Sequence, residues 1–449
     1  MRYAPLLVLM LASACAIGPN YSKPEVETPA QYKEAGDWVL AQPKDAMPKG
    51  KWWEAFDDPV LNQLIEQVEV SNQELRAAEA RYRQARSAVT SARSGLFPTL
   101  GGSADASRSR GSGQRYQVGV DARWEIDVWG RIRRLLEAAR AGEQASEADL
   151  AAARLSLQAE LATNYFQLRV TDVQRDLFDD TVAAFQRNYD MTQNRYRAGV
   201  AARVDVVQAE TQLLSAQAQA IDLKSTRAQL EHAIAVLTGK PPAAFTIEPK
   251  KMQVHIPEVP PGIPSTLLER RPDIAAAERR MAAANARIGV SQAAYFPALS
   301  LTGSAGFASN ALSTLFSAPS RFWSLGLGLA GTLLDFGARG AQVDISRAQY
   351  EEQVANYRQT VLDAFAEVEN NIAATRYLAE ESRIQAEAAR AARESVVLTV
   401  NQYKAGTVSF LNVVQVQATQ LNEERQTVQL VGRRLAATVA LIRAMGGSW

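Results

Sequence analysis

The side chains that most often perform catalysis or bind metals are rare in this sequence. Its 449 residues include two histidines, His232 and His255, and one cysteine, Cys15. A histidine-activated nucleophile, or a metal held by cysteine and histidine, needs several such residues at a fixed spacing. His232 lies in a helical pattern and His255 in a proline-rich stretch, and the sequence has no phosphate-binding glycine motif. We therefore predict no enzyme, no metal site and no cofactor.

Cys15 stands at the end of a short apolar N-terminal segment. The segment contains Arg2, an apolar run from Pro5 to Leu11, and small residues before the cysteine. This pattern is typical of a secretory signal, and it is too short for a membrane-spanning helix. We predict that residues 1–14 are a signal peptide and that Cys15 accepts a covalent lipid. The alternatives are ordinary signal cleavage and a small buried cysteine.

The charge balance limits the class of partner. The chain has 49 Lys and Arg against 48 Asp and Glu, which gives a net charge of +1. Because binding to phosphate depends on clustered basic residues, we expect no nucleic acid partner. Hydrophobic residues make up 47% of the chain, which is ample for a folded core.

The chain contains an internal repeat. The segment Ser94–Leu100 (SGLFPTL) matches Ala293–Leu299 (AAYFPAL), and Tyr196–Gln208 matches Tyr403–Gln415. A proline-rich tract between the two copies is typical of a linker. The predicted organisation is an N-terminal segment (15–60), repeat 1 (61–240), a linker (241–265) and repeat 2 (266–449).

Long runs of good helix formers dominate both repeats. The run from Arg131 to Arg195 has leucines spaced along one stripe, among them Leu150, Leu157 and Leu161. A helix of that extent would be about 95 Å long, which no globular core accommodates, so it indicates coiled-coil or helical-tube packing. The predicted helices span about 61–94, 131–196 and 203–238 in repeat 1, and about 266–294, 338–403 and 409–445 in repeat 2.

Strand patterns precede the long helices. From Tyr116 to Val128 apolar residues alternate strictly with polar residues or glycine, and Trp323–Leu334 shows a similar pattern. Such strands are close to the length of about 9–11 residues that a tilted bilayer crossing needs, and their polar faces suit a wet barrel lumen. The alternative is a pair of half-buried hairpins in a soluble sheet. The predicted strands span about 99–109, 115–128, 298–308 and 323–334.

Aromatic residues lie at the helix-side ends of these strands, as in the girdle of a membrane barrel. Four strands leave open edges, which a bilayer does not tolerate. The barrel hypothesis therefore predicts an obligate homo-oligomer, and three copies would supply about twelve strands with room for a lumen. The aromatic residues of this edge are Phe97, Trp129, Phe296 and Phe336.

An acidic residue stands where each strand pattern gives way to a long helix. Asp127 and Asp335 are each close to a glycine, Gly130 and Gly337 respectively. We predict that each carboxylate caps the positive end of the following helix rather than binding a substrate.

A glycine interrupts each long helical run within the same motif, Tyr-basic-Ala-Gly. These glycines, Gly199 and Gly406, can adopt the left-handed conformation that ends a helix. We predict that Ser409 is the N-cap of the next helix after the second turn, and that Asp205 is a favourable acid in the first turn of its counterpart.

Together these motifs resemble the outer-membrane efflux proteins of Gram-negative bacteria, which have the TolC-like fold, and in particular their OprM/NodT-type lipoprotein branch. The resemblance covers nearly the whole mature chain. It rests on CAIGPNY (15–21), WWEAFDDPVLNQLI (52–65), the two FP pairs, DVWG, DFG and the two glycine turns. It implies an α plus transmembrane β fold, with two repeats of long helical hairpins and a two-stranded β-hairpin each. Three copies would form a twelve-stranded outer-membrane barrel and a periplasmic helical tunnel.

The resemblance also implies a function. The chain would be the outer-membrane channel of a tripartite, RND-type efflux system, a passive exit duct for drugs or other small solutes. Its partners would be two further copies of itself in a homotrimer, a periplasmic adaptor (membrane fusion protein), an inner-membrane pump and outer-membrane lipid. The lipidated segment 15–60 would wrap the equatorial region of the tunnel. The alternatives are the exit duct of a type I secretion system and a periplasmic coiled-coil scaffold lipoprotein.

In this family the two glycine turns lie at the periplasmic tips, where the adaptor docks and the closed aperture lies. Mapped onto this chain, the adaptor-facing residues are Arg197, Gly199, Val200, Lys404, Gly406 and Thr407. The aperture residues are Asp205, Phe410, Leu411, Asn412 and Gln415. Some members carry acids just after the second turn, where this chain has the neutral Asn412 and Gln415. We therefore expect Phe410 or Leu411, rather than an acidic ring, to close the channel.

Overall fold

The computed structural model describes residues 16–26, 28–29, 31–35, 50–110, 113–250, 255–257, 259 and 270–447. The signal segment and Cys15 lie outside these residues. The chain divides into two compact units. Within the described ranges, unit 1 contains residues 16–26, 78–150 and 272–361, and unit 2 contains residues 28–77, 151–271 and 362–447.

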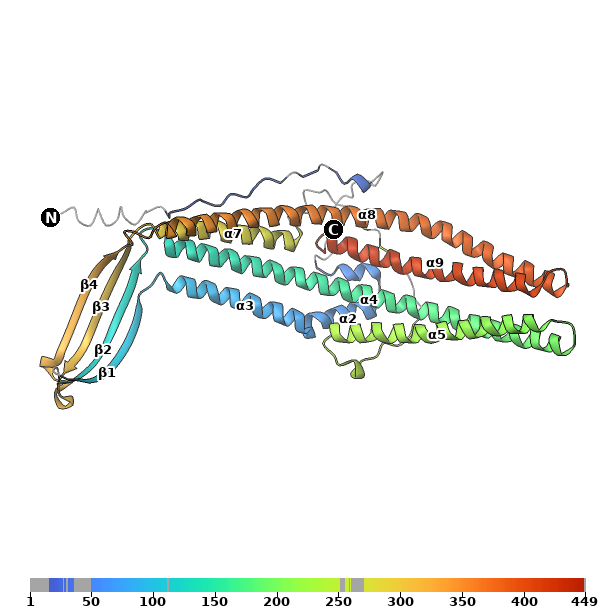
Figure 1. The fold of residues 1–449 in the computed structure, drawn as a ribbon, viewed down its shortest axis with the longest axis horizontal. Helices are drawn as coiled ribbons and strands as arrows, with labels where there is room; N and C mark the ends of the chain where they lie inside the picture. Colours follow the sequence, from blue (N-terminus) through green and yellow to red (C-terminus); the bar gives the residue numbers. More distant parts are fainter. Residues whose placement is uncertain are drawn as a thin grey trace. The chain divides into compact units, whose positions relative to one another are not determined.

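Unit 1 contains a four-stranded antiparallel sheet with the strands in chain order (Figure 1). Its strands are β1 (Thr99–Ser109), β2 (Gly113–Ile126), β3 (Ala298–Ser309) and β4 (Arg321–Ala330). The strand predicted over 323–334 instead begins at Arg321 and ends at Ala330. Ala330 pairs with Ala298, and the next residue on the partner strand is Pro297. Proline has no N–H to extend the ladder, which explains the early end.

The sheet joins the two sequence repeats. β1 and β2 come from repeat 1, β3 and β4 come from repeat 2, and β2 pairs with β3 along its length. Unit 2 likewise takes helices from both repeats. The repeats are therefore repeats of sequence, and each compact unit forms by packing equivalent parts of both copies against each other.

The helices α3 (Gln73–Ser94), α4 (Arg131–Arg197) and α8 (Ala338–Lys404) contribute residues to both units, and α7 (Pro272–Ala293) lies in unit 1. The predicted acidic caps are confirmed at α4 and α8. Asp127 accepts hydrogen bonds from the backbone N–H groups of Ile132 at 3.0 Å and Arg133 at 2.9 Å. Asp335 accepts from those of Gly337 and Arg339, both at 3.2 Å.

Unit 2 also contains α2 (Pro59–Ser71), α5 (Arg203–Leu237) and α9 (Phe410–Ala444). The helix predicted over 61–94 is wrong as a single element, because the chain breaks at Asn72. The Asn72 amide accepts from the Leu75 N–H at 2.9 Å and donates to the Leu237 carbonyl at 2.8 Å. Asparagine competes with helix hydrogen bonds in this way, so it ends α2 and starts α3.

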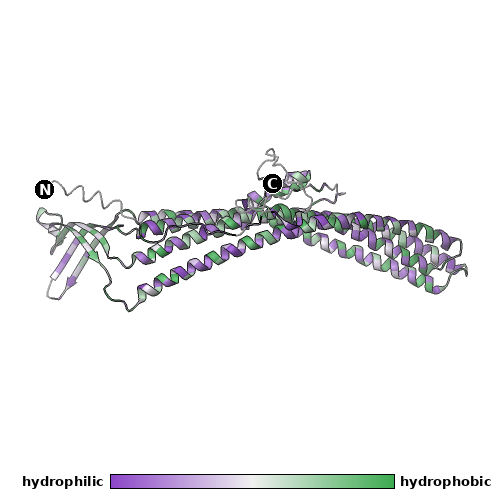
Figure 2. Ribbon diagram, turned by 90° about the horizontal axis from the view of Figure 1, so that it is seen from above, coloured by the Kyte–Doolittle hydropathy of each residue, from purple (hydrophilic) through white to green (hydrophobic). Residues whose placement is uncertain are grey.

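Along the long helices hydrophobic and hydrophilic residues interchange within each turn (Figure 2).

The N-terminal segment follows helices in each unit. In unit 1 the Arg134 guanidinium donates to the carbonyls of Ile17 at 3.1 Å and Gly18 at 3.0 Å. Gly18 crosses α7 at Gly289, where a Cβ on Gly18 would lie 2.4 Å from the Gly289 Cα. In unit 2 the backbone N–H groups of Lys33 and Glu34 donate to the carboxylate of Glu369. The segment is therefore held by specific hydrogen bonds along its described length.

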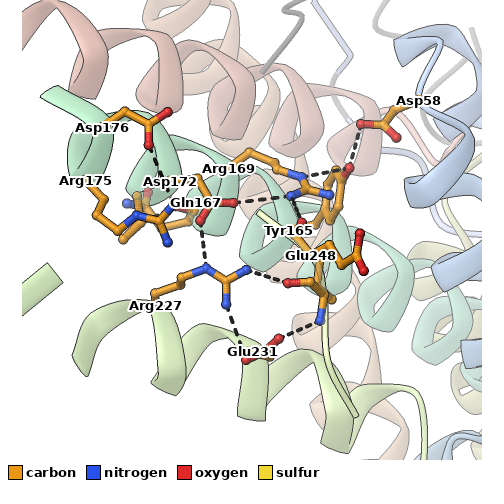
Figure 3. A network of polar contacts seen from close by, with 12 residues as sticks. Asp58, Tyr165, Gln167, Arg169, Asp172, Arg175, Asp176, Arg227, Glu231 and Glu248 are labelled. Atoms are coloured by element: carbon orange, nitrogen blue, oxygen red, sulfur yellow. Dashed lines mark hydrogen bonds and ion pairs between the residues drawn. The ribbon is translucent and has the colours of Figure 1, made fainter. Parts of the chain in front are cut away.

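A buried polar network holds the chain that follows α5 against the helices of unit 2 (Figure 3). The carboxylate of Asp172 pairs with Arg227 at 2.7 Å and with Arg169 at 3.3 Å. Arg227 also donates to the Ile247 carbonyl, and the Ile247 N–H donates to Glu231. The start of the linker, predicted from its prolines alone, is therefore anchored at Ile247.

Candidate functional site

Both long helices end with the same backbone geometry at the glycine turns. Gly199 has φ +76° and Gly406 has φ +78°, both in the left-handed region. The N–H of Val200 donates to the carbonyl of Arg195 at 2.9 Å, and the N–H of Thr407 donates to that of Gln402 at 3.0 Å. These six-to-one hydrogen bonds are Schellman motifs. The left-handed glycine conformation predicted from the sequence is confirmed in both copies.

A small apolar core in unit 2 connects the second turn to the helices on either side of the first turn. Ala209, Tyr403, Phe410 and Val413 are buried together. The Tyr403 and Phe410 rings lie 5.5 Å apart between centroids. The residues come from α5, α8 and α9, so the second turn is fixed to the helix that follows the first turn. Partly buried residues around this core are Tyr189, Met191, Val400, Val408 and Val414.

A cation–π contact joins the ends of α4 and α8. The guanidinium carbon of Arg195 lies 4.9 Å from the Tyr403 ring centroid, and the Arg195 Nε is buried without a hydrogen-bond partner among the described residues. Burial raises the pKa of the Tyr403 hydroxyl above its ordinary value of 10.0; Arg195 lowers it and Asp205 raises it. The sequence alone does not predict this contact. Arg195 precedes Tyr196, and nothing near it in the sequence indicates that its guanidinium contacts Tyr403 instead.

The predicted adaptor-facing residues are all exposed at the two turns. The residues flanking Gly199 and Gly406 extend into solvent, and Val200 is 65% exposed although it is apolar. The structure therefore brings the predicted residues of each turn together on an accessible surface. They are Arg197, Gly199, Val200, Lys404, Gly406 and Thr407.

The predicted aperture residues divide into two groups. Leu411, Asn412 and Gln415 are exposed on the first turns of α9. Phe410 is only 1% exposed, because it packs beneath Tyr403 in the turn core. The expectation that Phe410 closes the channel is corrected on this ground: its ring belongs to the interior of its own chain.

The two helix starts after the turns use different capping chemistry. The half-buried Asp205 accepts from the backbone N–H of Ala202 at 3.3 Å and so stabilises the start of α5, as predicted. Ser409 occupies the N-cap position of α9 but makes no side-chain hydrogen bond to the backbone there. Its hydroxyl instead donates to the Asn412 side-chain oxygen at 2.7 Å. The predicted position of Ser409 is confirmed, whereas its capping hydrogen bond is not formed.

In unit 1 the register of the sheet separates two faces. Leu100 pairs with Ala122, Ala122 with Gly303, and Gly303 with Leu325. The apolar positions of all four strands therefore fall on one face, which includes the exposed side chains of Trp323 and Leu327. The opposite face carries mostly polar residues and glycine, including Asp121, Arg123, Thr302 and Ser304, with Phe322 of β4 as an apolar exception.

The four aromatic residues of the predicted membrane edge lie at the sheet ends nearest the helices. Trp129 stacks on Phe296 with ring centroids 4.8 Å apart, and its indole N–H donates to the Pro297 carbonyl at 2.8 Å. Phe97 and Phe336 are largely exposed. The Trp129–Phe296 pair connects the end of β2 to the start of β3, a contact between the repeats that the sequence did not reveal.

No helix among the described residues is both long enough and apolar enough to cross a membrane. In the same part of the chain, no group of three or more His, Cys, Asp or Glu side chains is placed to hold a metal ion. Both His232 and His255 are exposed.

The sequence matches the outer membrane efflux protein family over residues 64–240 and 263–447. It is 30% identical to the probable efflux pump outer membrane protein TtgC of Pseudomonas putida, over 98% of this chain and 94% of that protein. The structure resembles that of the outer-membrane channel OprN, with TM-score 0.90 and 32% identity, covering 97% of this chain and 100% of that one. It also resembles the open state of the MtrE outer membrane channel of Neisseria gonorrhoeae, with TM-score 0.86 and 30% identity, covering 96% of this chain and 98% of that one. The predicted TolC-like fold and the predicted efflux function in the outer membrane are thereby confirmed. This chain belongs to the outer membrane efflux protein family.

Proposed function

We propose that the chain is the passive exit duct of a tripartite efflux system, and that it works as a homotrimer. It would conduct drugs or other small solutes and catalyse no reaction. The observation that carries the proposal is the sheet of unit 1. It has an exposed apolar face, a largely polar face and two edges that no described strand pairs with.

The strand edges favour assembly from three copies. β1 pairs with β2 and β4 pairs with β3, so one side of each outer strand is left unpaired within the described chain. An unpaired edge in a bilayer leaves backbone polar groups without hydrogen bonds. Three copies of a four-stranded sheet give twelve strands, a barrel wide enough for a lumen. The apolar face would then contact lipid, and Asp121 and Arg123 would face the lumen.

The exposed apolar face of the sheet favours a membrane channel over a soluble scaffold protein. Trp323 is 80% exposed and Leu325 is 70% exposed on β4. A soluble sheet would bury these side chains against helices, because a contiguous exposed apolar face is unfavourable in water. A lipid environment removes that cost.

Two features of the structure support the proposed adaptor and lipid partners. The exposed turns at Gly199 and Gly406 offer paired surfaces to a periplasmic adaptor, which would connect the duct to an inner-membrane pump. In unit 1 the backbone of Ala16 packs so closely on Gly130 that an added Cβ there would lie 2.6 Å away. The residue after Cys15 is therefore fixed beside Trp129, at the proposed membrane edge, where a lipid on Cys15 would enter the bilayer.

Disulfide cross-linking of the strand edges tests the trimer. In a Cys15→Ser background, Leu100→Cys on β1 is combined in turn with Leu325→Cys, Leu327→Cys or Leu329→Cys on β4. The matched control combines Leu100→Cys with Ala122→Cys, which are partners within one sheet. We expect at least one edge pair to give covalent dimers and trimers on non-reducing gels, because adjoining strands bring Cα atoms within about 4.4–6.8 Å. The control should stay monomeric.

Absence of cross-linked species from every edge pair, with an intact intrachain bond in the control, would overturn the trimer. Conductance of the parent protein in planar bilayers tests the duct separately. A cross-linkable trimer that conducts no ions in the presence of its adaptor and pump would refute the duct while leaving the assembly in place.

A further inference from the structure

A cavity of about 290 Å³ opens between α4, α5 and α9 in unit 2. Its volume is near the lower end of the range for small-molecule sites, about 300–1,000 Å³. Phe178 and Phe185 contribute its apolar wall from α4, and Leu421 contributes from α9. Gln219, Asn422 and Arg425 contribute polar groups. The cavity thus combines aromatic surface with a few converging donors, as small-molecule sites do.

The guanidinium of Arg425 has unused hydrogen-bonding capacity. It donates from Nη2 to the Asn422 side-chain oxygen at 3.3 Å, while its Nε is buried and has no partner among the described residues. A guanidinium carries five N–H donors, and leaving a buried charged donor unsatisfied is unfavourable. An anion in the cavity would remove this cost.

The acids next to Arg425 in the sequence are engaged elsewhere. Glu423 accepts a hydrogen bond from Gln385 at 2.6 Å, and Glu424 pairs with Arg393. The described residues that line the cavity include no carboxylate, so its only formal charge is the positive charge of Arg425. The electrostatic environment therefore favours a negatively charged occupant.

The aromatic wall is preformed. Phe178 is 2% exposed and Phe185 is 6% exposed, and Phe185 packs in one cluster with Leu213 and Ala216 of α5. A wall held by core packing keeps its shape when the cavity is empty, which lowers the cost of binding a flat ring.

From these observations we propose that this cavity binds a small amphipathic anion. One aromatic ring or a short alkyl group lies against Phe178 and Phe185, and a carboxylate or sulfonate accepts hydrogen bonds from Arg425. Such a ligand would contact α4, α5 and α9 together. The inference rests on the cavity alone and does not depend on the channel function.

Equilibrium dialysis of the full-length, detergent-solubilised protein tests the site with naphthalene-1-sulfonate as the probe. Its neutral counterpart, 1-naphthalenemethanol, and detergent without protein serve as blanks for partitioning. We expect saturable binding of one sulfonate per chain and at least about tenfold weaker binding of the alcohol, because charged hydrogen bonds to Arg425 are absent.

Three variants locate the site. Arg425→Gln should weaken sulfonate binding at least about tenfold, since the amide keeps polarity but removes the charge. Arg433→Gln is the matched control on α9: its guanidinium is largely exposed and pairs with Glu381, so binding should change less than about twofold. Ser215→Trp fills the cavity from α5 and should abolish binding even if Arg425→Gln misfolds.

The proposal is overturned if the parent protein binds the sulfonate no better than the alcohol. Occupation of the cavity by a carboxylate of a second copy of the chain would give this result. Unchanged binding in Ser215→Trp, with the helical circular dichroism of the parent, would also overturn it.

Discussion

The guanidinium of Arg195 covers the ring of Tyr403 and so joins the last turn of α4 to the last turn of α8, with 4.9 Å between the guanidinium carbon and the ring centroid. Tyr403 in turn packs on Phe410 at the start of α9. The repeat-equivalent residue Tyr196 is 40% exposed, whereas Tyr403 is 7% exposed. Two turns with the same backbone therefore differ in their packing, and only the second is part of a core.

This asymmetry predicts different effects of two adjacent substitutions. Phe410→Ala should destabilise the turn region by about 3–5 kcal/mol, because it removes a buried ring and leaves a cavity. Leu411→Ala should cost less than about 0.5 kcal/mol, because Leu411 is 48% exposed. Amide hydrogen exchange in the first turns of α9 measures both. Equal protection in the two variants would contradict the assignment of Phe410 to the core.

Replacing the glycine of a turn by alanine should cost conformational free energy without causing a steric clash. An added Cβ at Gly199 meets no atom of the described residues within 4 Å, so Gly199→Ala should cost about 1–2 kcal/mol from the left-handed backbone alone. Gly142→Ala is the matched control inside α4, where a Cβ likewise meets no atom within 4 Å in the described part of the chain. It should stabilise the helix by about 0.5–1 kcal/mol. We expect amide hydrogen exchange to become faster around residue 199 in Gly199→Ala and slower around residue 142 in Gly142→Ala. A change in the same direction in both variants would contradict the conformational explanation.

The buried network predicts a large effect at Asp172. Its side chain is 3% exposed between the guanidinium groups of Arg169 and Arg227. Asp172→Ala should cost about 3–5 kcal/mol, because both cations lose their buried carboxylate. Asp176→Ala, one turn further on α4, removes a half-exposed carboxylate and should cost less than about 1 kcal/mol. Chemical denaturation monitored by circular dichroism compares them, and a similar midpoint in both variants would refute the prediction.

Asp335 predicts a dependence of stability on pH. The hydrogen bond from the Arg339 guanidinium, aided by backbone N–H groups, lowers the pKa of Asp335 below its ordinary value of 3.8. A lowered pKa means that the ionised carboxylate stabilises the fold above pH 3.8, and that this contribution disappears as the pH falls through the folded-state pKa. Asp335→Asn should therefore unfold at a lower temperature than the parent near neutral pH, and the difference should shrink in strong acid.

The control for this experiment is Asp344→Asn, whose side chain is 78% exposed. Thermal unfolding at several pH values between 7 and 2 should show no pH-dependent difference from the parent for this variant. A difference between Asp335→Asn and the parent that stays constant over that range would argue against the proposed role of the ionised carboxylate.

The local chemistry of the chain was sufficient to determine much of this fold. Alternating apolar residues mark β2, because a strand presents successive side chains to opposite faces. Gly199 and Gly406 mark the ends of α4 and α8, because glycine adopts the left-handed conformation at little cost. Asp127 and Asp335 mark the helix starts for an equally local reason. Each of these features depends on a few neighbouring residues.

The tertiary structure decided what depends on residues far apart in the sequence. The repeat makes Phe410 equivalent to Arg203, yet Phe410 is buried and Arg203 is exposed. Asn72 interrupts a helical pattern because the Leu237 carbonyl lies within reach of its amide. Pairing of β2 with β3, and of Asp172 with Arg227, likewise requires the chain to return to the same place. Burial and long-range hydrogen bonds arise only when distant segments pack together, and a local sequence pattern does not specify which segments meet.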